Sequence, residues 1–216
     1  MTRRLAIVVP AKDTAQAKSR LAPLLSPETR RALADALFRQ TLGVLRNAKL
    51  DASIFVVTDS PRLAEEAGEF GAEVIRDSGT SLTEAVDLAT RQIARAGFDS
   101  QLVIPSDIAL LDATEIRQLL AATGTMPSVV LCPSADEDGT NALLTTPPDA
   151  LPIWYGPGSF QRYCRAAQSA EVALTVIKLA GLGLDLDTPD DVRRYVAQAP
   201  KGPILDLLRP WLAAAS

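Results

Sequence analysis

Two aspartates near the C-terminus, Asp185 and Asp187, alternate with leucines in the stretch LDLD. Because side chains alternate with a period of two along an extended chain, both carboxylates are predicted to face the same way. Two such carboxylates repel each other unless a cation lies between them, and oxygen ligands suit Mg²⁺ or Mn²⁺. Asp187 could instead cap the next helix, at Pro189, but Asp185 has no such structural role. We interpret the pair as metal ligands.

A third carboxylate, Asp107, follows the apolar run that ends in Ile104-Pro105. An aspartate at the tip of a buried strand is a natural ligand for a metal ion or a ribose, and the alternative is a helix or turn cap. We treat Asp107 as the third candidate metal ligand.

A basic segment, PAKDTAQAKSRL, follows the apolar run Leu5–Val9 and carries Lys12, Lys18 and Arg20. Lysine acts on phosphate as a point charge, and arginine can bind two oxygens at once. The glycine spacing of a P-loop is missing. Because the whole chain has a net charge of −4, these cations are a local concentration. The segment predicts a polyphosphate site, and a solvated basic loop is the alternative.

Two further segments could present backbone amides and hydroxyls to an anion. One is Gly139-Thr140-Asn141, before an apolar run, and an ordinary turn explains it equally well. The other is Tyr155–Ser159, with Gly156 inside it, where a helix N-terminus would favour an anion. A simple helix entry capped by Ser159 is the alternative for this second segment.

Composition limits the chemistry. The chain contains no histidine, which removes the usual general base and zinc ligand and most catalytic triads. Any catalysis must therefore depend on carboxylates, lysine, arginine, hydroxyls, backbone dipoles or an oxygen-bound metal. Cys132 and Cys164 lie far apart and fit no metal or redox spacing, so we expect reduced thiols.

The 216 residues are enough for one α/β domain, and residues 1–216 are predicted to form a single domain. The acidic balance argues against a nucleic-acid partner. No apolar run approaches the roughly 18 residues needed to span a bilayer, so no membrane partner is expected. The N-terminal sequence lacks signal-peptide features, so a cytoplasmic location is expected.

Hydrophobic periodicity and helix-start signals predict alternating strands and helices for the first two-thirds of the chain. The expected strands are 5–9, 53–58, 72–75, 102–105, 128–132, 141–145, 172–178 and 182–186. The expected helices are 27–47, 61–71, 82–96, 114–122, 159–170 and 204–214, and a further helix is expected to begin at Thr188-Pro189. This order predicts an α/β fold: a three-layer sandwich with a mostly parallel twisted sheet between helices. Ligands of such sheets bind beyond the carboxyl ends of the strands.

Five motifs in order, PAKDTAQAKSRL, IPSDIALL, DGTNALL, YGPGSF and LDLDTPDD, resemble those of the 2-phospho-L-lactate guanylyltransferase family. The resemblance covers about residues 5 to 198. It implies the nucleotidyltransferase fold, similar to that of nucleotide-sugar transferases. It also implies transfer of GMP from GTP to 2-phospho-L-lactate, phosphoenolpyruvate or 3-phospho-D-glycerate in coenzyme F-420 biosynthesis, with pyrophosphate released and a downstream transferase taking the product.

The resemblance also implies roles for individual residues. The basic loop would hold the GTP phosphates, with Lys18 catalytic and Lys12 and Arg20 binding. The three aspartates would be catalytic and hold Mg²⁺ or Mn²⁺. The positions expected to bind the two substrates are Thr83, near the nucleotide, and Thr140, Asn141, Gly156 and Ser159, near the acceptor acid.

The chain departs from the family pattern at three positions. Thr83 stands where members typically have asparagine, Ala109 where they commonly have proline, and Tyr163 where they often have histidine. The departure at Thr83 affects the expected contact with the base or ribose, and the departure at Tyr163 affects the expected identity of the acceptor. The sequence also leaves open a homodimer.

The implied reaction needs no general base, because a phosphomonoester has a second pKa of about 6 and is mostly dianionic at neutral pH. Three other interpretations remain at this point. The chain could be a nucleotidyltransferase for another nucleotide or acceptor, a non-catalytic nucleotide-binding protein, or another α/β enzyme in which the aspartates are caps.

Overall fold

The computed structural model describes residues 4–12, 18–77, 81–198 and 201–214, and the middle of the basic segment, residues 13–17, lies outside this part. The strands are β1 (Leu5–Pro10), β2 (Ala52–Thr58), β3 (Glu73–Arg76), β4 (Ser100–Val103), β5 (Ser128–Pro133), β6 (Thr140–Thr146) and β7 (Ala173–Val176). The helices are α1 (Pro27–Asn47), α2 (Pro61–Glu69), α3 (Leu82–Arg95), α4 (Ala113–Ala121), α5 (Ser159–Ser169), α6 (Pro189–Gln198) and α7 (Pro203–Ala214).

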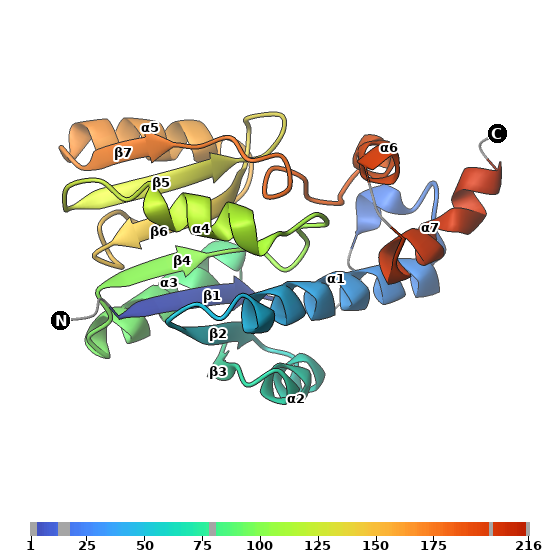
Figure 1. Ribbon diagram of the computed structural model, residues 1–216, viewed down its shortest axis with the longest axis horizontal. Helices are drawn as coiled ribbons and strands as arrows, with labels where there is room; N and C mark the ends of the chain where they lie inside the picture. The colour runs from blue at the N-terminus through green and yellow to red at the C-terminus, as the bar shows by residue number, and fades with distance from the viewer. Residues whose placement is uncertain (1–3, 13–17, 78–80, 199–200, 215–216) are drawn as a thin grey trace.

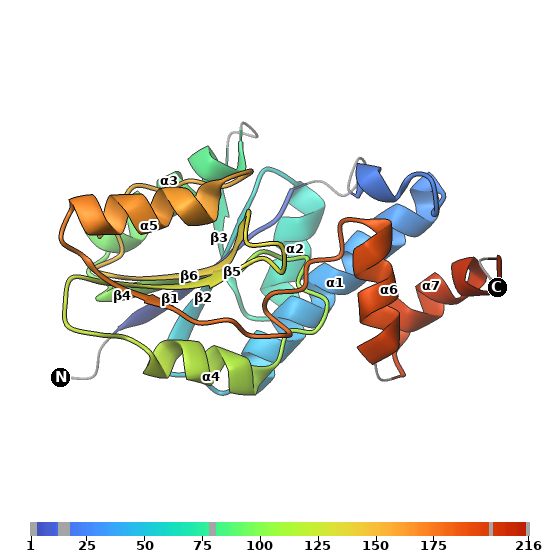
Figure 2. The same ribbon diagram turned by 90° about the horizontal axis from the view of Figure 1, so that it is seen from above.

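The strands form one mixed sheet in the order β3-β2-β1-β4-β6-β5-β7 (Figure 1). Helices cover both faces (Figure 2). One face buries apolar side chains of α1, α2 and α4, and the opposite face buries those of α3 and α5. The predicted three-layer arrangement is confirmed.

The direction of β6 determines which strand ends lie side by side at one edge of the sheet. Strand β6 runs antiparallel to both of its neighbours, β4 and β5, whereas the other neighbouring pairs are parallel. The amino end of β6 therefore lies beside the carboxyl ends of β4 and β5. Thr140 and Asn141, at the start of β6, reach the edge where Asp107 follows β4.

A separate apolar cluster lies beyond this edge, where α6 and α7 pack against the N-terminal half of α1 (Figure 1). Leu33 and Leu37 of α1 and Leu208 of α7 have no exposed surface. Leu184 and Leu186, from the segment before α6, belong to the same cluster. The cluster therefore anchors the chain that carries Asp185 and Asp187.

The predicted helix starts at Ser26, Ser60 and Ser81 are confirmed, because each hydroxyl accepts a hydrogen bond from the first turn of its helix. The predicted cap at Ser159 is wrong: Gly158, in a left-handed conformation, is the cap, and Ser159 is the first residue of α5. None of the helices in the described part of the chain is long and apolar enough to cross a membrane.

The predicted strand over 182–186 is also wrong. This segment makes a single bridge, between Asp185 and Ile108. Two of its amides donate hydrogen bonds outside any strand pairing. The Leu182 amide donates to the Glu115 carboxylate at 2.7 Å, and the Leu184 amide donates to the Gly181 carbonyl at 3.2 Å. Hydrogen bonds within a local turn and to one side chain thus take the place of the regular pairing with a neighbouring strand.

Candidate active site

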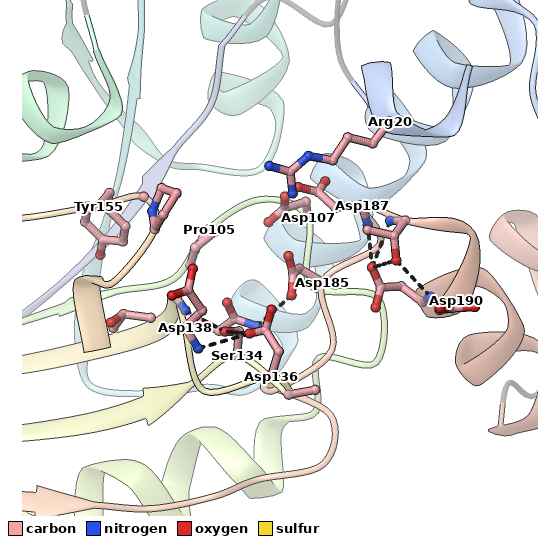
Figure 3. A pocket seen from close by; sticks show the side chains of 18 of the residues that line it. Arg20, Pro105, Asp107, Ser134, Asp136, Asp138, Tyr155, Asp185, Asp187 and Asp190 are labelled. Carbon is pink, nitrogen blue, oxygen red and sulfur yellow. Dashed lines mark hydrogen bonds between the residues drawn. The ribbon is translucent and has the colours of Figure 1, made fainter. Parts of the chain in front are cut away.

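Three carboxylates converge at the edge of the sheet. Each of Asp107, Asp185 and Asp187 offers an oxygen atom, and these oxygens all lie within 4.8 Å of one another. The three side chains point into a shared space (Figure 3). The structure thus brings together all three aspartates that the sequence singled out, in an arrangement that could bind a metal ion.

The alternation of the LDLD stretch explains why two of these carboxylates share a side. Leu184 and Leu186 are 3% and 0% exposed, so Asp185 and Asp187, between and after them, face the opposite way. Thr188 rather than Asp187 caps α6, because the Thr188 hydroxyl accepts the Asp191 amide at 3.3 Å. The capping explanation for Asp187 is therefore excluded.

Backbone hydrogen bonds fasten this stretch to the chain around Asp107. The Leu186 amide donates to the Asp107 carbonyl at 3.3 Å, and the Ala109 amide donates to the Leu184 carbonyl at 3.1 Å. The Asn141 side-chain amide donates to Asp185 Oδ1 at 3.1 Å. Asn141 thus positions a candidate metal ligand.

Glu115 of α4 holds the turn that precedes the stretch. Its two carboxylate oxygens accept the Gly181 amide at 2.9 Å and the Leu182 amide at 2.7 Å. Only glycine fits at position 181, because a Cβ there would lie 2.3 Å from the Leu110 carbonyl oxygen. This role could not be predicted from the sequence, because a glutamate in the first turn of a helix is common without such contacts.

Glu115→Gln is expected to lower kcat about tenfold, because an amide can accept only one of the two hydrogen bonds and the segment carrying Asp185 would be held less firmly. The Mg²⁺ concentration for half-maximal activity should rise while the KM for nucleotide stays the same. Steady-state kinetics over a Mg²⁺ series measure both. Glu65→Gln, on the exposed face of α2, is the matched control, and an equal effect there would contradict the assignment.

Lys18 lies against two of the three carboxylates. Its ammonium donates to Asp107 Oδ2 at 2.8 Å and to Asp187 Oδ1 at 2.6 Å, and its side chain is 5% exposed. Burial by itself would lower the pKa of Lys18, but Asp107 and Asp187 outweigh it and raise the pKa above its ordinary value. Its backbone is left-handed, with φ 56°, which is uncommon for a side chain of this kind and concentrates at functional sites.

Asp185 is the carboxylate whose charge is least compensated. Burial, and then the neighbouring charge of Asp107, raise the pKa of Asp185 above its ordinary value of 3.8, against the hydrogen bond from Asn141. A carboxylate buried beside like charges is destabilised unless a cation joins it. The geometry and the charge therefore both favour cation binding here.

The three aspartates line a cleft of about 430 Å³ that is strongly acidic. Its described lining holds two arginines, Arg20 and Arg194, against the carboxylates of Asp107, Asp136, Asp138, Asp185, Asp187, Asp190 and Asp191. Anionic ligands would enter such a cleft only with cations, so this lining fits a site that works with a metal ion.

The basic residues take different places. Arg20 lines the cleft and points over the carboxylates (Figure 3). Lys12 lies outside the cleft lining, and its ammonium is 3.8 Å from Asp77. The three cations of the basic segment therefore take separate places: Arg20 lines the cleft, Lys18 is buried against Asp107 and Asp187, and Lys12 lies beside Asp77.

The two segments expected to bind the acceptor, Gly139–Asn141 and Tyr155–Ser159, both contribute to the cleft lining. Thr140, Asn141 and Gly156 line the cleft. Ser159 does not: it is 2% exposed, and its hydroxyl donates to the Thr140 hydroxyl at 3.1 Å. Ser159 thus orients Thr140 from behind.

Asp138 already occupies the N-terminus of α5, where the sequence suggested an anion site. Its carboxylate accepts the Gly158 amide at 3.0 Å, and its carbonyl accepts the Phe160 amide at 3.3 Å. Nearby, Ser134 links Asp136 to the Gly139 amide through hydrogen bonds of 2.6 and 2.8 Å. These contacts were not predicted from the sequence: those of Ser134 lie within one loop, whereas the Asp138–Gly158 contact spans 20 residues.

Comparison with known proteins places the chain in a family. A family model described as "Guanylyl transferase CofC like" matches residues 5–198. The chain belongs to this family. The 3-phospho-D-glycerate guanylyltransferase of Colwellia psychrerythraea is 44% identical over 189 residues, covering 88% of this chain and 90% of the relative. The phosphoenolpyruvate guanylyltransferase of Rubrobacter xylanophilus is 36% identical over 190 residues, covering 88% and 92%.

A solved structure shares the fold. A protein of Desulfovibrio desulfuricans G20, provisionally described as a nucleotide-diphospho-sugar transferase, matches with a TM-score of 0.77 at 18% identity, over 97% of this chain and 95% of that chain. The predicted fold and family are confirmed, and the protein is an enzyme of the nucleotidyltransferase type.

The three departures from the CofC-like pattern now have structural explanations. Ala109 keeps an amide that donates to Leu184, which a proline could not do. The Thr83 hydroxyl accepts the Tyr155 amide at 3.0 Å and so supports the wall of the cleft. Tyr163 is fully buried, and its hydroxyl accepts the Trp154 amide at 2.9 Å. None of the three lines the described cleft.

Tyr163→Phe is expected to lower the free energy of unfolding by about 1–2 kcal/mol, because the half-buried Trp154 amide loses its acceptor. The KM for the acceptor should rise only a few-fold, since Tyr163 acts through the backbone before Tyr155. Urea unfolding and acceptor kinetics measure the two effects. A loss of acceptor binding greater than about a hundredfold would instead place Tyr163 in contact with substrate.

Proposed function

We propose that this protein transfers GMP from GTP to a small phosphorylated carboxylic acid and releases pyrophosphate. The observation that carries the proposal is the convergence of Asp107, Asp185 and Asp187 within 4.8 Å, in a cleft of a guanylyl transferase CofC-like chain. Within the family resemblance, the reaction would serve coenzyme F-420 biosynthesis.

We propose 3-phospho-D-glycerate as the first acceptor to test. The relative named for that acid shares 44% identity with this chain, against 36% for the phosphoenolpyruvate guanylyltransferase of Rubrobacter xylanophilus. Phosphoenolpyruvate and 2-phospho-L-lactate are the alternatives. The cytoplasmic location, a homodimer and transfer of the product to a downstream transferase stay predictions.

The proposed cofactor is Mg²⁺, held by the oxygens of Asp107, Asp185 and Asp187. The residues fit this ion, because the donor set is all oxygen and the carboxylates outnumber the cations around them. When bound, Mg²⁺ would supply positive charge beside the phosphates, with Mn²⁺ as a substitute.

The chain's own residues would contribute positioning and charge. A phosphate oxygen of the acceptor attacks the α-phosphorus of GTP, forming a new P–O bond, and the bond from the α-phosphorus to the β-phosphate oxygen breaks to release pyrophosphate. The acceptor phosphate is already dianionic near pH 7, so no proton has to be removed, which agrees with a chain that has no histidine. Fixed cations that bring two anions together then supply most of the catalysis.

We assign the residues as follows. Arg20, with Lys18 and Lys12, binds the phosphates of GTP. Thr140 and Gly156 contact the acceptor, and Asn141 and Ser159 position Asp185 and Thr140. Thr83 supports the wall near Tyr155. The cleft lining supports the roles of Arg20, Thr140 and Gly156, and hydrogen bonds support those of Asn141, Ser159 and Thr83. The phosphate roles of Lys12 and Lys18 rest on the family resemblance.

The proposal is tested by measuring pyrophosphate release in a matrix of four nucleoside triphosphates and the three phospho acids with Mg²⁺. The expected result is release that needs GTP and one of the acids. Release with CTP in place of GTP would support a related nucleotidyltransferase. GTP binding by calorimetry with no release for any acid would support a non-catalytic binding protein.

A further inference from the structure

The Lys18 ammonium occupies the position of a counter-ion within the carboxylate cluster. It donates to Asp107 Oδ2 at 2.8 Å and to Asp187 Oδ1 at 2.6 Å, two of the three residues that the proposed function assigns to a metal ion. Its side chain is 5% exposed, so these two carboxylates are its immediate surroundings. Such charge-assisted hydrogen bonds are short and strong, and Lys18 therefore satisfies the same oxygens that a cation would use.

A divalent cation and this ammonium would compete. Mg²⁺ takes its oxygen ligands at about 2.0–2.1 Å and demands near-octahedral geometry. A second cation hydrogen-bonded to the same carboxylates would be held within a few ångströms of it, where like charges repel strongly. Lys18 would have to give up at least part of its contact with Asp107 and Asp187.

A displaced Lys18 ammonium needs another anionic partner. Lys18 lies two residues before Arg20, which lines the cleft where the proposed triphosphate would bind. Phosphate oxygens could replace the carboxylates as acceptors. We infer that Lys18 competes with the divalent cation for the aspartate cluster and passes to the nucleotide phosphates, so that nucleotide binding strengthens cation binding. The inference rests on the proposed function for the metal role of the three aspartates.

Binding of Mn²⁺ alone, measured from the electron paramagnetic resonance signal of the free ion, tests the competition. Lys18→Met should bind Mn²⁺ at least about tenfold more tightly than the wild type, because the competing charge is gone. Lys49→Met, a charge-matched change at an exposed position after α1, should bind Mn²⁺ like the wild type. An equal gain in both variants, or no gain in Lys18→Met, would overturn the inference.

A second measurement uses the wild-type chain, so it does not depend on a variant that folds. Lysine acetylation by a water-soluble reagent, mapped by mass spectrometry, should be slow at Lys18, which is 5% exposed. Saturating Mn²⁺ should raise labelling at Lys18 at least about threefold and leave Lys49 in the same sample unchanged. Unchanged labelling of Lys18 while Mn²⁺ is bound would contradict the displacement.

Failure of the proposed metal role and failure of the Lys18 competition give different results. If Asp185→Asn binds Mn²⁺ as well as the wild type does, the aspartates are not the metal site and the proposed cofactor role fails. If Asp185→Asn loses Mn²⁺ binding but neither Lys18 measurement changes, the metal site stands and the competition is wrong.

Discussion

Asp185→Asn is expected to reduce pyrophosphate release by at least about a thousandfold without unfolding the protein. The asparagine keeps the size of the side chain and an oxygen that can accept the hydrogen bond from Asn141. It removes the negative charge at the centre of the cluster, and with it the ligand that we assign to Mg²⁺. Turnover is measured with GTP and the best acceptor at saturating Mg²⁺.

The same substitution is expected to make the metal-free protein more stable at neutral pH. Because folding raises the pKa of Asp185 above 3.8, the ionised carboxylate is disfavoured in the folded state. The wild type therefore loses stability as the pH rises through the raised pKa, and Asp185→Asn does not. Its Tm in a chelator should exceed that of the wild type by a few degrees at pH 7, and the difference should vanish below about pH 3.8.

The control for both readouts is Asp87→Asn, which removes the same charge from the exposed face of α3. It should leave turnover unchanged. Adding Mg²⁺ should raise the Tm of the wild type and of this control, but not that of Asp185→Asn. Normal turnover in Asp185→Asn would contradict the metal role of Asp185. A Tm that falls together with turnover would show that Asp185 is a structural residue.

Lys18→Ala is expected to reduce kcat/KM for GTP about a hundredfold or more while the KM of the acceptor changes less than about threefold. The reason is that Lys18 supplies a charge to the triphosphate, and its side-chain hydrogen bonds in the described part of the chain go to Asp107 and Asp187 rather than to the residues assigned to the acceptor. Initial rates with each substrate varied in turn separate the two constants.

Lys49→Ala is the matched control for this experiment and should leave both constants near those of the wild type. If Lys18→Ala raised only the KM of the acceptor, the basic segment would face the acceptor and the two substrates would have to exchange places in the cleft. Equal losses for both substrates would indicate that Lys18 acts mainly by holding Asp107 and Asp187.

The carboxylate cluster was predictable because its cause is local. The LDLD stretch alternates buried leucines with aspartates, and Leu184 and Leu186 do lie in the apolar cluster under the site. Asp107 could be placed because ligands of α/β sheets gather where strands end. The helix starts at Ser26, Ser60 and Ser81 follow from cap chemistry that involves neighbouring residues only.

Other features depend on contacts between distant segments. The Glu115 carboxylate accepts hydrogen bonds from the Gly181 and Leu182 amides, which lie 66 and 67 residues farther along the chain. The sequence pattern of a helix cannot predict such distant partners. Asp138 accepts the Gly158 amide with its carboxylate and the Phe160 amide with its carbonyl, and the first of these contacts spans 20 residues of the chain. The strand predicted over 182–186 is absent because the Leu182 amide donates to the distant Glu115 carboxylate and the Leu184 amide donates to the Gly181 carbonyl in a local turn.

Transfer of GMP onto the phosphate of a small acid at the aspartate cluster can be followed by ³¹P NMR of a single reaction mixture. With GTP, Mg²⁺ and 3-phospho-D-glycerate, we expect two coupled doublets from a new diphosphate linkage, together with one equivalent of pyrophosphate. Both should be absent with Asp185→Asn. Formation of GDP and inorganic phosphate, or an unchanged spectrum with each of the three acids, would rule out guanylyl transfer to these acids at this site.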